Sequence, residues 1–437
     1  MSHYKPYPAY KDSGVEWLGR VPEHWECARF DAKTTTHRDS IEADRLNGVR
    51  VLHYSIPAVQ AFGCAQEEEG SEIDSNKLVV SQRQLLVSKL NPHKQTLVVA
   101  DSSDSLLAIA STEFVPLIPV SADLGYITYV WSSAYCQHYL LARCESSTRS
   151  HQRVAPSDIT RMSWVWPGLE EQAAIVRALD RETGRIDALI EKKARFIELL
   201  REKRQALITH AATKGLNPNV KMKDSGVEWL GKVPEHWTVS RLGHFASVEN
   251  GSTPSRENPD FWENGTVPWL GSGEVNQVQV TEATELITEL ALQTCSLRLL
   301  PKETVVVGMV GQGKTRGLAA ILKIDAAINQ NLAAICSGPR LKPMFMLFFF
   351  GAAYTWIRES GRGSNQAALN CELLSEIRLA LPPMNEQEEI VRHLVTNGER
   401  MDALIEKTER SIEFLKERRS ALITAAVTGQ IDLRESA

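Results

Sequence analysis

Two stretches of the chain place apolar residues at steps of three and four, which is the spacing of one face of an α-helix. Glu, Lys and Arg fill the positions between them. The first stretch carries Ile186, Leu189, Ile190, Ile197, Leu200, Leu207 and Ile208, and the second carries Met401, Leu404, Ile405, Ile412, Leu415, Leu422 and Ile423. Residues 185–212 predict a helix of 28 residues, roughly 42 Å long at about 1.5 Å per residue.

Gly184 and Gly398 precede the two stretches at similar places, which predicts a short helix that breaks before each long one. Asn385 and Glu388 have the spacing of a capping pair at a helix start. Each apolar stripe has the width of a coiled-coil seam. We therefore expect the two long helices to pack antiparallel on each other. The alternative is two amphipathic helices that lie on separate cores.

The segments in front of the helices alternate short β-rich runs with turns. Strands are expected within 77–92 and 304–312, aromatic helices at 126–141 and 344–357, and polar basic loops at 144–153 and 359–370. This mixture predicts the α/β class, in the mixed α+β form, for each segment.

The chain also contains an internal duplication. KDSGVEWLGRVPEHW at 11–25 returns as KDSGVEWLGKVPEHW at 223–237, and the helical block that starts at Pro167 returns at Pro382. The segments between these blocks share little. One duplicated frame around two unlike fillings predicts a pseudo-two-fold dimer within one chain. We expect globular domains at 1–166 and 216–381, and helical regions at 167–215 and 382–437.

The composition is typical of a soluble globular protein. Of 437 residues, 43% are hydrophobic and 24% are charged, and the net charge of −5 argues against a strongly basic, independent DNA binder. Seven scattered cysteines without a C-x-x-C pair predict reduced thiols, no zinc site and a cytoplasmic location. The N-terminus lacks the apolar core of a signal peptide. The longest apolar run, 343–357, is short for a membrane span.

GMVGQGKT, residues 308–315, fits the phosphate-binding pattern G-x-x-x-x-G-K-[ST]. A working P-loop needs a helix directly behind the loop. Here Gly317 follows soon after Thr315, the following ILKI suits another strand, and the first half has no equivalent. We expect a glycine-hinged hairpin that presents polar groups to a DNA phosphate backbone. ATP binding is the alternative.

Polar and basic residues on the glycine-flanked loops are the candidates for DNA contact, because they suit phosphate and base-edge hydrogen bonds. In the first half they are Lys89, Lys94, Arg149, His151 and Arg153. In the second half they are Ser252, Thr253, Arg256, Gln312, Lys314, Thr315, Arg316, Arg362, Ser364, Asn365 and Gln366. We expect Lys314 and Arg316 in particular to contact DNA. The alternative for each basic loop is an ordinary solvated loop.

Signatures of catalysis are missing from the sequence, including paired carboxylates, Ser-His-Asp, H-E-x-x-H, G-x-G-x-x-G behind a strand, and N-P-P-[FY]. His24 and His236 lie beside Trp25 and Trp237 in the duplicated P-E-H-W, which favours packing or a partner contact over catalysis. We therefore expect a non-catalytic chain without catalytic, cofactor-binding or metal-ligating residues.

The opening D-S-G-V-E-W-L-G-x-V-P-E-H-W and the closing E-Q-x-x-I-V…D-A-L-I-E-K…A-L-I-T-x-A of each half resemble the specificity subunit of Type I restriction–modification enzymes. Further segments are similar to that family: HYSIPA (53–58), SNKLVVSQRQLLVSKLNP (75–92), STEFVPLIP (111–119), NGSTPSRENPDFW (250–262), VPWLGSGEVN (267–276), GQGKTRG (311–317) and INQNLAAI (328–335). The resemblance covers essentially the whole chain.

This resemblance implies that each globular domain is a target-recognition domain for one half of a split double-stranded DNA sequence, with the helices as the spacer. It implies two docked methyltransferase subunits that bind S-adenosylmethionine, and restriction (motor–nuclease) subunits that use ATP and Mg. This chain itself would hold no cofactor and bind no membrane. Three other classes stay open: a P-loop ATPase, a self-sufficient methyltransferase, and a coiled-coil scaffold that does not bind DNA.

Overall fold

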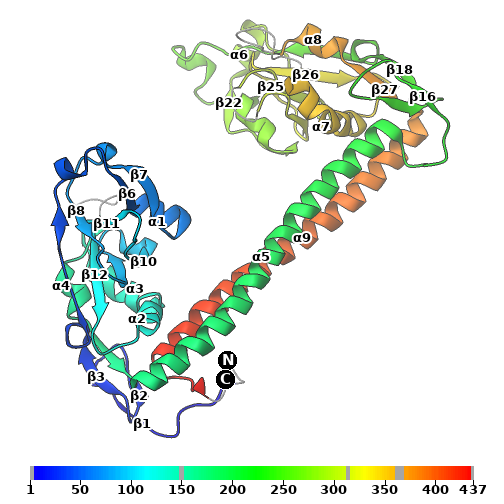
Figure 1. The fold of residues 1–437 in the computed structure, drawn as a ribbon. Helices are drawn as coiled ribbons and strands as arrows, with labels where there is room; N and C mark the ends of the chain where they lie inside the picture. Colours follow the sequence, from blue (N-terminus) through cyan, green and yellow to red (C-terminus); the bar gives the residue numbers. More distant parts are fainter. Residues whose placement is uncertain (1–3, 147–151, 312–314, 360–368, 435–437) are drawn as a thin grey trace. The chain divides into compact units, whose positions relative to one another are not determined.

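The computed structural model describes residues 4–146, 152–311, 315–359 and 369–434. The chain forms two compact units: unit 1 comprises 1–194 and 409–437, and unit 2 comprises 195–408. Two long helices, α5 (Leu169–Lys214) and α9 (Met384–Val427), each contribute to both units (Figure 1). Among the described residues, no helix is long and apolar enough to cross a membrane.

Helices α5 and α9 pack antiparallel, as the apolar stripes predicted. As α5 advances from Asp187 to Arg204, the ion-pair partner on α9 moves back from Arg419 to Asp402. The two pairs have N–O distances of 2.9 and 2.6 Å. Because both pairs are exposed, they fix the register of the helices more than they add stability.

The helices are longer and more continuous than the pattern predicted. Helix α5 has 46 residues and α9 has 44, and both run unbroken through Gly184 and Gly398. The predicted short helices are therefore wrong, because packing on both sides of each glycine offsets its cost of about 1 kcal/mol. The predicted capping pair is also wrong. Helix α9 begins before Asn385, and the Glu388 carboxylate instead pairs with Lys342 at 2.7 Å.

Unit 1 contains a four-stranded antiparallel sheet in the order β10-β9-β12-β4 and a five-stranded sheet in the order β5-β8-β11-β6-β7. The strands of these sheets are β4 (Thr34–Thr35), β5 (Ser40–Ile41), β6 (Arg50–Tyr54), β7 (Gln66–Glu69), β8 (Lys77–Val79), β9 (Gln84–Ser88), β10 (Leu97–Ala100), β11 (Leu107–Ser111) and β12 (Phe114–Pro119). Two-stranded pairs are formed by β1 (Tyr10–Asp12) with β2 (Arg20–Pro22), β3 (Glu26–Arg29) with β15 (Ser163–Trp166), and β13 (Glu145–Ser146) with β14 (Gln152–Arg153). The short helices are α1 (Ile56–Phe62), α2 (Leu124–Trp131), α3 (Ala134–Leu141) and α4 (Pro156–Thr160).

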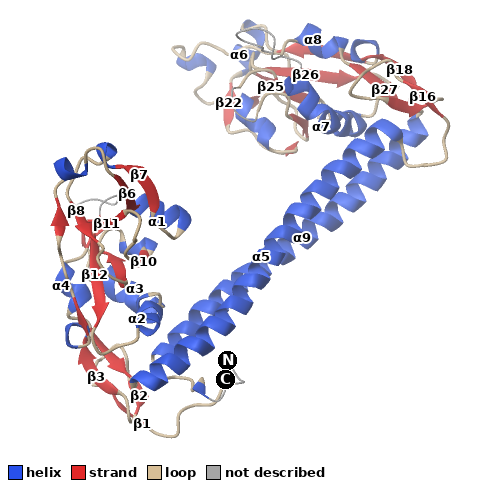
Figure 2. Ribbon diagram, viewed as in Figure 1, coloured by secondary structure: helices blue, strands red, loops and turns tan. Residues whose placement is uncertain are grey.

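Unit 2 contains a five-stranded sheet in the order β19-β26-β23-β24-β21 and a three-stranded sheet in the order β22-β20-β25. Their strands are β19 (Ala246–Asn250), β20 (Val267–Leu270), β21 (Gln279–Val280), β22 (Glu285–Ile287), β23 (Val305–Gly308), β24 (Ala319–Leu322), β25 (Ala327–Ile328) and β26 (Leu332–Ser337). Two-stranded pairs are formed by β16 (Met222–Asp224) with β17 (Lys232–Pro234), and by β18 (Thr238–Arg241) with β27 (Arg378–Leu381). The helices are α6 (Glu289–Thr294), α7 (Pro343–Glu359) and α8 (Cys371–Glu376). In Figure 2 the strands of each unit are flanked by its short helices.

The two units repeat one topology, although their filling sequences differ. The antiparallel order β4-β12-β9-β10 of unit 1 returns in unit 2 as β19-β26-β23-β24. The parallel pair β6 with β11 returns as β20 with β25, and antiparallel β7 and β22 flank them in the same way. The internal repeat therefore extends through the fillings, which confirms the mixed α/β class for both.

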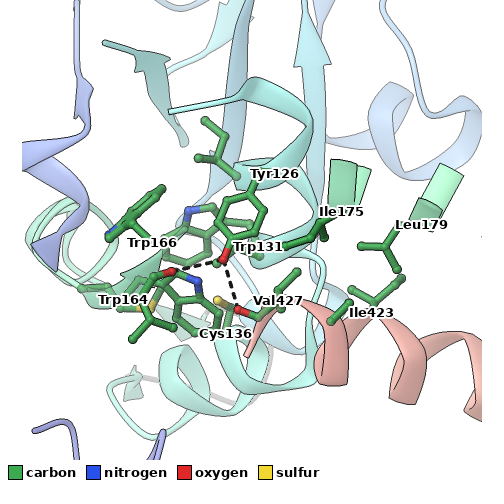
Figure 3. Packing of buried hydrophobic residues seen from close by; sticks show 14 of the residues in the cluster. Tyr126, Trp131, Cys136, Trp164, Trp166, Ile175, Leu179, Ile423 and Val427 are labelled. Atoms are coloured by element: carbon green, nitrogen blue, oxygen red, sulfur yellow. Dashed lines mark hydrogen bonds between the residues drawn. The ribbon is translucent and has the colours of Figure 1, made fainter. Parts of the chain in front are cut away.

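The core of unit 1 is rich in aromatic residues and uses both long helices. The hydroxyl of buried Tyr126 on α2 lies 3.1 Å from the carbonyl of Val165 and 3.2 Å from that of Val427 at the end of α9 (Figure 3). Trp131, Trp164, Trp166, Ile175, Leu179 and Ile423 surround this contact. Burial raises the pKa of Tyr126, which keeps its hydroxyl protonated as a donor.

The duplicated sequence blocks lock the frame of each unit. His24 meets the Glu171 carboxylate at 2.8 Å, and its repeat His236 meets Glu386 at 2.8 Å. These pairs join the P-E-H-W motif to the first turn of a long helix. The two histidines therefore have the packing role that the sequence favoured.

The glutamine that follows each of these glutamates is buried and holds the filling. The Gln172 amide donates to the Pro167 carbonyl at 2.8 Å, and its oxygen accepts from the backbone N–H of Asp123, just before α2, at 2.8 Å. The repeat Gln387 donates to the carbonyls of Pro382 and Arg340 at 2.9 and 3.0 Å. Its oxygen accepts from the backbone N–H just before α7 at 2.8 Å.

Candidate nucleic-acid interface

In both units, candidate residues gather where the central strand ends. The strand β9 leads into Lys89 and the strand β23 leads into Met309. The Lys89 N–H donates to the Glu113 carbonyl at 3.0 Å, and the Met309 N–H donates to the Asn331 carbonyl at 2.8 Å. The loop behind each central strand is thereby held against the turn between the two sheets, β11–β12 in unit 1 and β25–β26 in unit 2.

After each basic loop, the chain returns to the end of the central strand. The Val154 N–H donates to the Lys89 carbonyl at 3.0 Å, and the Leu369 N–H donates to the Met309 carbonyl at 3.1 Å. Three connections therefore converge at one end of each central sheet. The connection between β9 and β10 is the topological counterpart of the one between β23 and β24, although the first half has no equivalent of the glycine motif.

The loop behind β23 is a hairpin and not a P-loop. Strands β23 and β24 pair antiparallel, so a strand and not a helix follows the loop. The Gly317 N–H donates to the Gly308 carbonyl at 2.8 Å, and a Cβ on Gly308 would lie 2.4 Å from the Thr315 carbonyl oxygen. Gly308 and Gly317 thus allow the close approach of the two ends of this connection. The predicted glycine-hinged hairpin is confirmed.

Two candidates on the described part of this hairpin have contacts within unit 2. The Thr315 hydroxyl donates to the Val310 carbonyl at 3.4 Å. The Arg316 guanidinium donates to the carbonyl of Arg358 in the last turn of α7. A cation at a helix C-terminus stabilises the exposed carbonyls and the helix dipole. Arg316 therefore has a structural task in unit 2, and its expected contact with DNA stays a prediction.

The candidates Ser252 and Thr253 lie on a loop that is pinned to the β20–β25 pair. The Ser252 N–H donates to the Ile328 carbonyl at 3.1 Å, and the Trp269 indole donates to the Ser252 carbonyl at 3.1 Å. The Thr253 hydroxyl donates to the side-chain oxygen of Gln330. This places both candidates beside the turn between β25 and β26.

Arg256 is engaged on the same loop. Its guanidinium makes a bidentate pair with Glu285 at 2.8 and 2.7 Å and lies 3.8 Å from the ring centroid of Trp262. The pair lowers the pKa of Glu285 below its ordinary value of 4.5. Arg256 thus fixes the loop onto the three-stranded sheet, while part of its side chain stays exposed.

In unit 1 the candidates Lys89, Lys94 and Arg153 come from segments that meet at the end of β9. Arg153 forms an ion pair with Glu113 at 3.0 Å, on the turn that accepts from the Lys89 backbone. The Lys94 ammonium donates to the Gln60 side chain at 3.2 Å on the neighbouring helix α1. All three cations belong to one loop cluster, which the sequence could not show.

The remaining candidates lie outside the described residues. They are Arg149, His151, Gln312, Lys314, Arg362, Ser364, Asn365 and Gln366. Sequence reasoning also missed the turns at 111–113 and 328–331 as part of the cluster. Their signal was a short polar run between two apolar strands, which is equally typical of an ordinary turn.

The long helices expose apolar residues at repeat-equivalent positions. Leu189 in unit 1 and its repeat Leu404 in unit 2 are 47% and 45% exposed. Leu199 in unit 2 and its repeat Phe414 in unit 1 are 47% and 68% exposed. The repeat therefore keeps a large apolar side chain exposed at two matching positions of the long helices.

The family model and the curated relatives that this chain resembles all point to one family. The family model described as "Type I restriction modification DNA specificity domain" matches residues 234–413. The putative type I restriction enzyme MjaX specificity subunit of Methanocaldococcus jannaschii is 25% identical over 437 residues, which cover 95% of this chain and 96% of that protein. The EcoR124I/EcoR124II specificity subunit of Escherichia coli is 25% identical over 195 residues, or 44% of this chain. That alignment spans only 46% of the relative's own length.

Two solved structures share the fold. A chain from a study of complex assembly and conformational transition of the type I R-M system superposes with a TM-score of 0.76 at 17% identity, covering 94% of this chain and 99% of that one. The HsdS subunit from Thermoanaerobacter tengcongensis superposes with a TM-score of 0.56 at 17% identity, covering 94% of this chain and 98% of that one. At this identity the likeness concerns the architecture alone.

Proposed function

Because this chain belongs to the family of Type I restriction–modification specificity subunits, we propose that it selects the DNA sequence on which a methyltransferase complex acts. Each unit reads one half of a split double-stranded target. The observation that carries this proposal is the repeated topology with unlike loops: two equivalent sheets hold different side chains at the same strand end. Such an arrangement suits a protein that recognises two different DNA sequences with two domains of the same topology.

DNA contact at these loops follows from their chemistry. Lys89, Lys94 and Arg153 supply cations for phosphates, and Ser252 and Thr253 supply hydrogen-bonding groups for base edges or phosphates. With a net charge of −5, the chain has little long-range attraction for DNA of its own. We propose that the partner subunits provide the rest of the positive field.

Helices α5 and α9 set the distance between the two half-sites and dock two methyltransferase subunits. Support comes from the exposed apolar residues Leu189, Leu199, Leu404 and Phe414, which occupy repeat-equivalent positions on the two helices. Leu189→Ser and Leu404→Ser are a matched pair of tests. Each should weaken capture of one methyltransferase subunit in the full complex and leave the thermal stability of this chain within about 0.5 kcal/mol, as expected for exposed positions.

In this proposal the chain is non-catalytic and works in the cytoplasm. The methyltransferase subunits supply S-adenosylmethionine chemistry, and restriction subunits supply ATP- and Mg-dependent translocation and cleavage. The antiparallel strand β24 that follows GMVGQGKT supports this division, because a P-loop is followed by a helix whose N-terminus binds the phosphate.

The first experiment is a genome-wide map of methylated adenines in cells with and without this gene, with the methyltransferase partner expressed in both. Loss of methylation at one asymmetric, gapped motif supports the proposal and identifies the target. Unchanged methylation at every motif contradicts it. Nucleotide binding by the isolated chain, abolished by Lys314→Ala, would favour the ATPase class instead.

A further inference from the structure

The turn between the two sheets has the same construction in both units. In unit 2 the side-chain oxygen of Asn329 accepts from the Asn331 N–H at 3.0 Å. In unit 1 the Ser111 hydroxyl accepts from the Glu113 N–H at 3.2 Å. In each case one residue lies between the two bonded positions. That residue is Gln330 in unit 2 and Thr112 in unit 1, and both are exposed.

The turn in unit 2 is held from three directions. Its first carbonyl, that of Ile328, accepts from Ser252 at 3.1 Å, and the Asn329 N–H donates to Leu270 at 3.0 Å. The Asn331 carbonyl accepts from Met309 at 2.8 Å. Asn329 is only 7% exposed, so its amide is buried inside the turn. The backbone under Gln330 is therefore fixed by three neighbouring segments.

The side chain of Gln330 is also oriented. The Thr253 hydroxyl donates to its oxygen, which limits rotation of the amide. Among the residues that the structure describes, its Nε2 donates to no protein group, and its oxygen accepts only from Thr253. The side chain thus offers a donor and an acceptor side by side. Adenine presents the complementary N6 donor and N7 acceptor in the major groove.

From this geometry we propose that the apex residue of the inter-sheet turn reads a base edge: Gln330 for the half-site of unit 2, and Thr112 for that of unit 1. The inference rests on the proposed function and assigns a specificity role within it. Thr253 is a positioning residue for Gln330. The two backbones are equivalent and the two apex residues differ, so the same position specifies different bases in the two halves.

A neutral amide separates this role from a phosphate contact. Loss of a phosphate contact weakens binding to every sequence and reduces the salt dependence of the affinity, because each phosphate contact releases cations from the DNA. Loss of a base contact changes the base preference at one position of the target and leaves the salt dependence of the affinity unaltered. The loss of one bidentate base contact is about a 5- to 150-fold loss of discrimination at that position.

The test uses the full complex of this chain with its methyltransferase subunits, and duplexes that carry each of the four bases at each position of the mapped target. Gln330→Ala should lose that discrimination at one position of one half-site, with an unchanged slope of affinity against salt. Thr253→Val should reduce preference at the same position. Thr112→Ala should act on the other half-site. Gln293→Ala, an exposed glutamine on α6, is the matched control and should bind as the wild type does.

Uniform weakening of Gln330→Ala on all sequences, or an unchanged preference at every position, overturns the inference. If Gln330→Ala fails to assemble, Thr253→Val decides in its place, and an unchanged preference in that variant overturns the inference as well. A wild-type complex without any split target would refute the proposed function itself. That outcome is distinct, because it requires no variant.

Discussion

Replacement of Gln387 by methionine should loosen unit 2 at the start of α7. The change keeps side-chain length and removes three hydrogen bonds. The Pro382 carbonyl loses a buried donor, which costs about 1–3 kcal/mol, and the two partly buried partners cost about 0.5–1.5 kcal/mol each. The expected loss of local stability is therefore about 2–6 kcal/mol.

Hydrogen exchange followed by mass spectrometry measures this loss locally. A loss of 2 kcal/mol corresponds to at least about 30-fold faster exchange of the amides that this lock protects. The faster exchange should appear in peptides that cover the start of α7 and not in those that cover α2. Gln172→Met is the reciprocal control, because it removes the equivalent lock in unit 1. It should give the opposite pattern.

Two results would refute this reasoning. If Gln387→Met accelerates exchange by less than about threefold at α7, the amide contributes less than the roughly 1 kcal/mol of a single net hydrogen bond. If the variant accelerates amide exchange equally in α2 and α7, the glutamine stabilises the whole chain. The local effect that we infer from its three hydrogen bonds is then wrong.

Three further predictions use other parts of the structure. Gly429→Val should strongly lower the melting temperature, because Gly429 has φ +72° and a Cβ there would lie 2.3 Å from Pro22, whereas Gly14→Val, at φ +68° with open space around it, should lower it less, because it adds the backbone strain without the clash. Arg434 lowers the pKa of Asp432 below its ordinary 3.8. The ionised Asp432 therefore stabilises the fold above pH 3.8, and this stabilisation is lost as pH falls through the folded pKa. Asp432→Asn should accordingly show a smaller loss of melting temperature between about pH 5 and 3 than the wild type. Lys94→Ala should weaken DNA binding on all sequences and reduce the salt slope by roughly one, and an unchanged slope would exclude a phosphate contact.

Much of the fold could be predicted from local pattern. The steps of three and four in the helical blocks predicted the antiparallel helices, and the duplicated motifs predicted an internal repeat, because both signals can be read directly from the sequence. The helix ends could not be read in the same way. Continuation through Gly184 and Gly398 is decided by tertiary packing, which outweighs the propensity of one glycine.

The candidate site could be predicted only in part. Basic loops and glycine hinges were visible as composition, and the hairpin at 308–317 followed from the strand behind it. The meeting of 88–95 with 111–113, and of 309 with 331, depends on backbone hydrogen bonds between segments distant in sequence. Such pairings leave no local pattern. The internal tasks of Arg256 and Arg316 were hidden for the same reason, since their partners Glu285 and Arg358 lie far along the chain.

The frame holds its fillings through groups that every filling possesses. Gln172 and Gln387 bind backbone N–H and C=O groups at the start of α2 and α7. A bond to a backbone group does not depend on the side chain at that position. The fillings can therefore differ almost completely in sequence and still dock on the same frame. The exposed apex residues are free of these bonds, so the residues that we propose to specify DNA are among those that the frame constrains least.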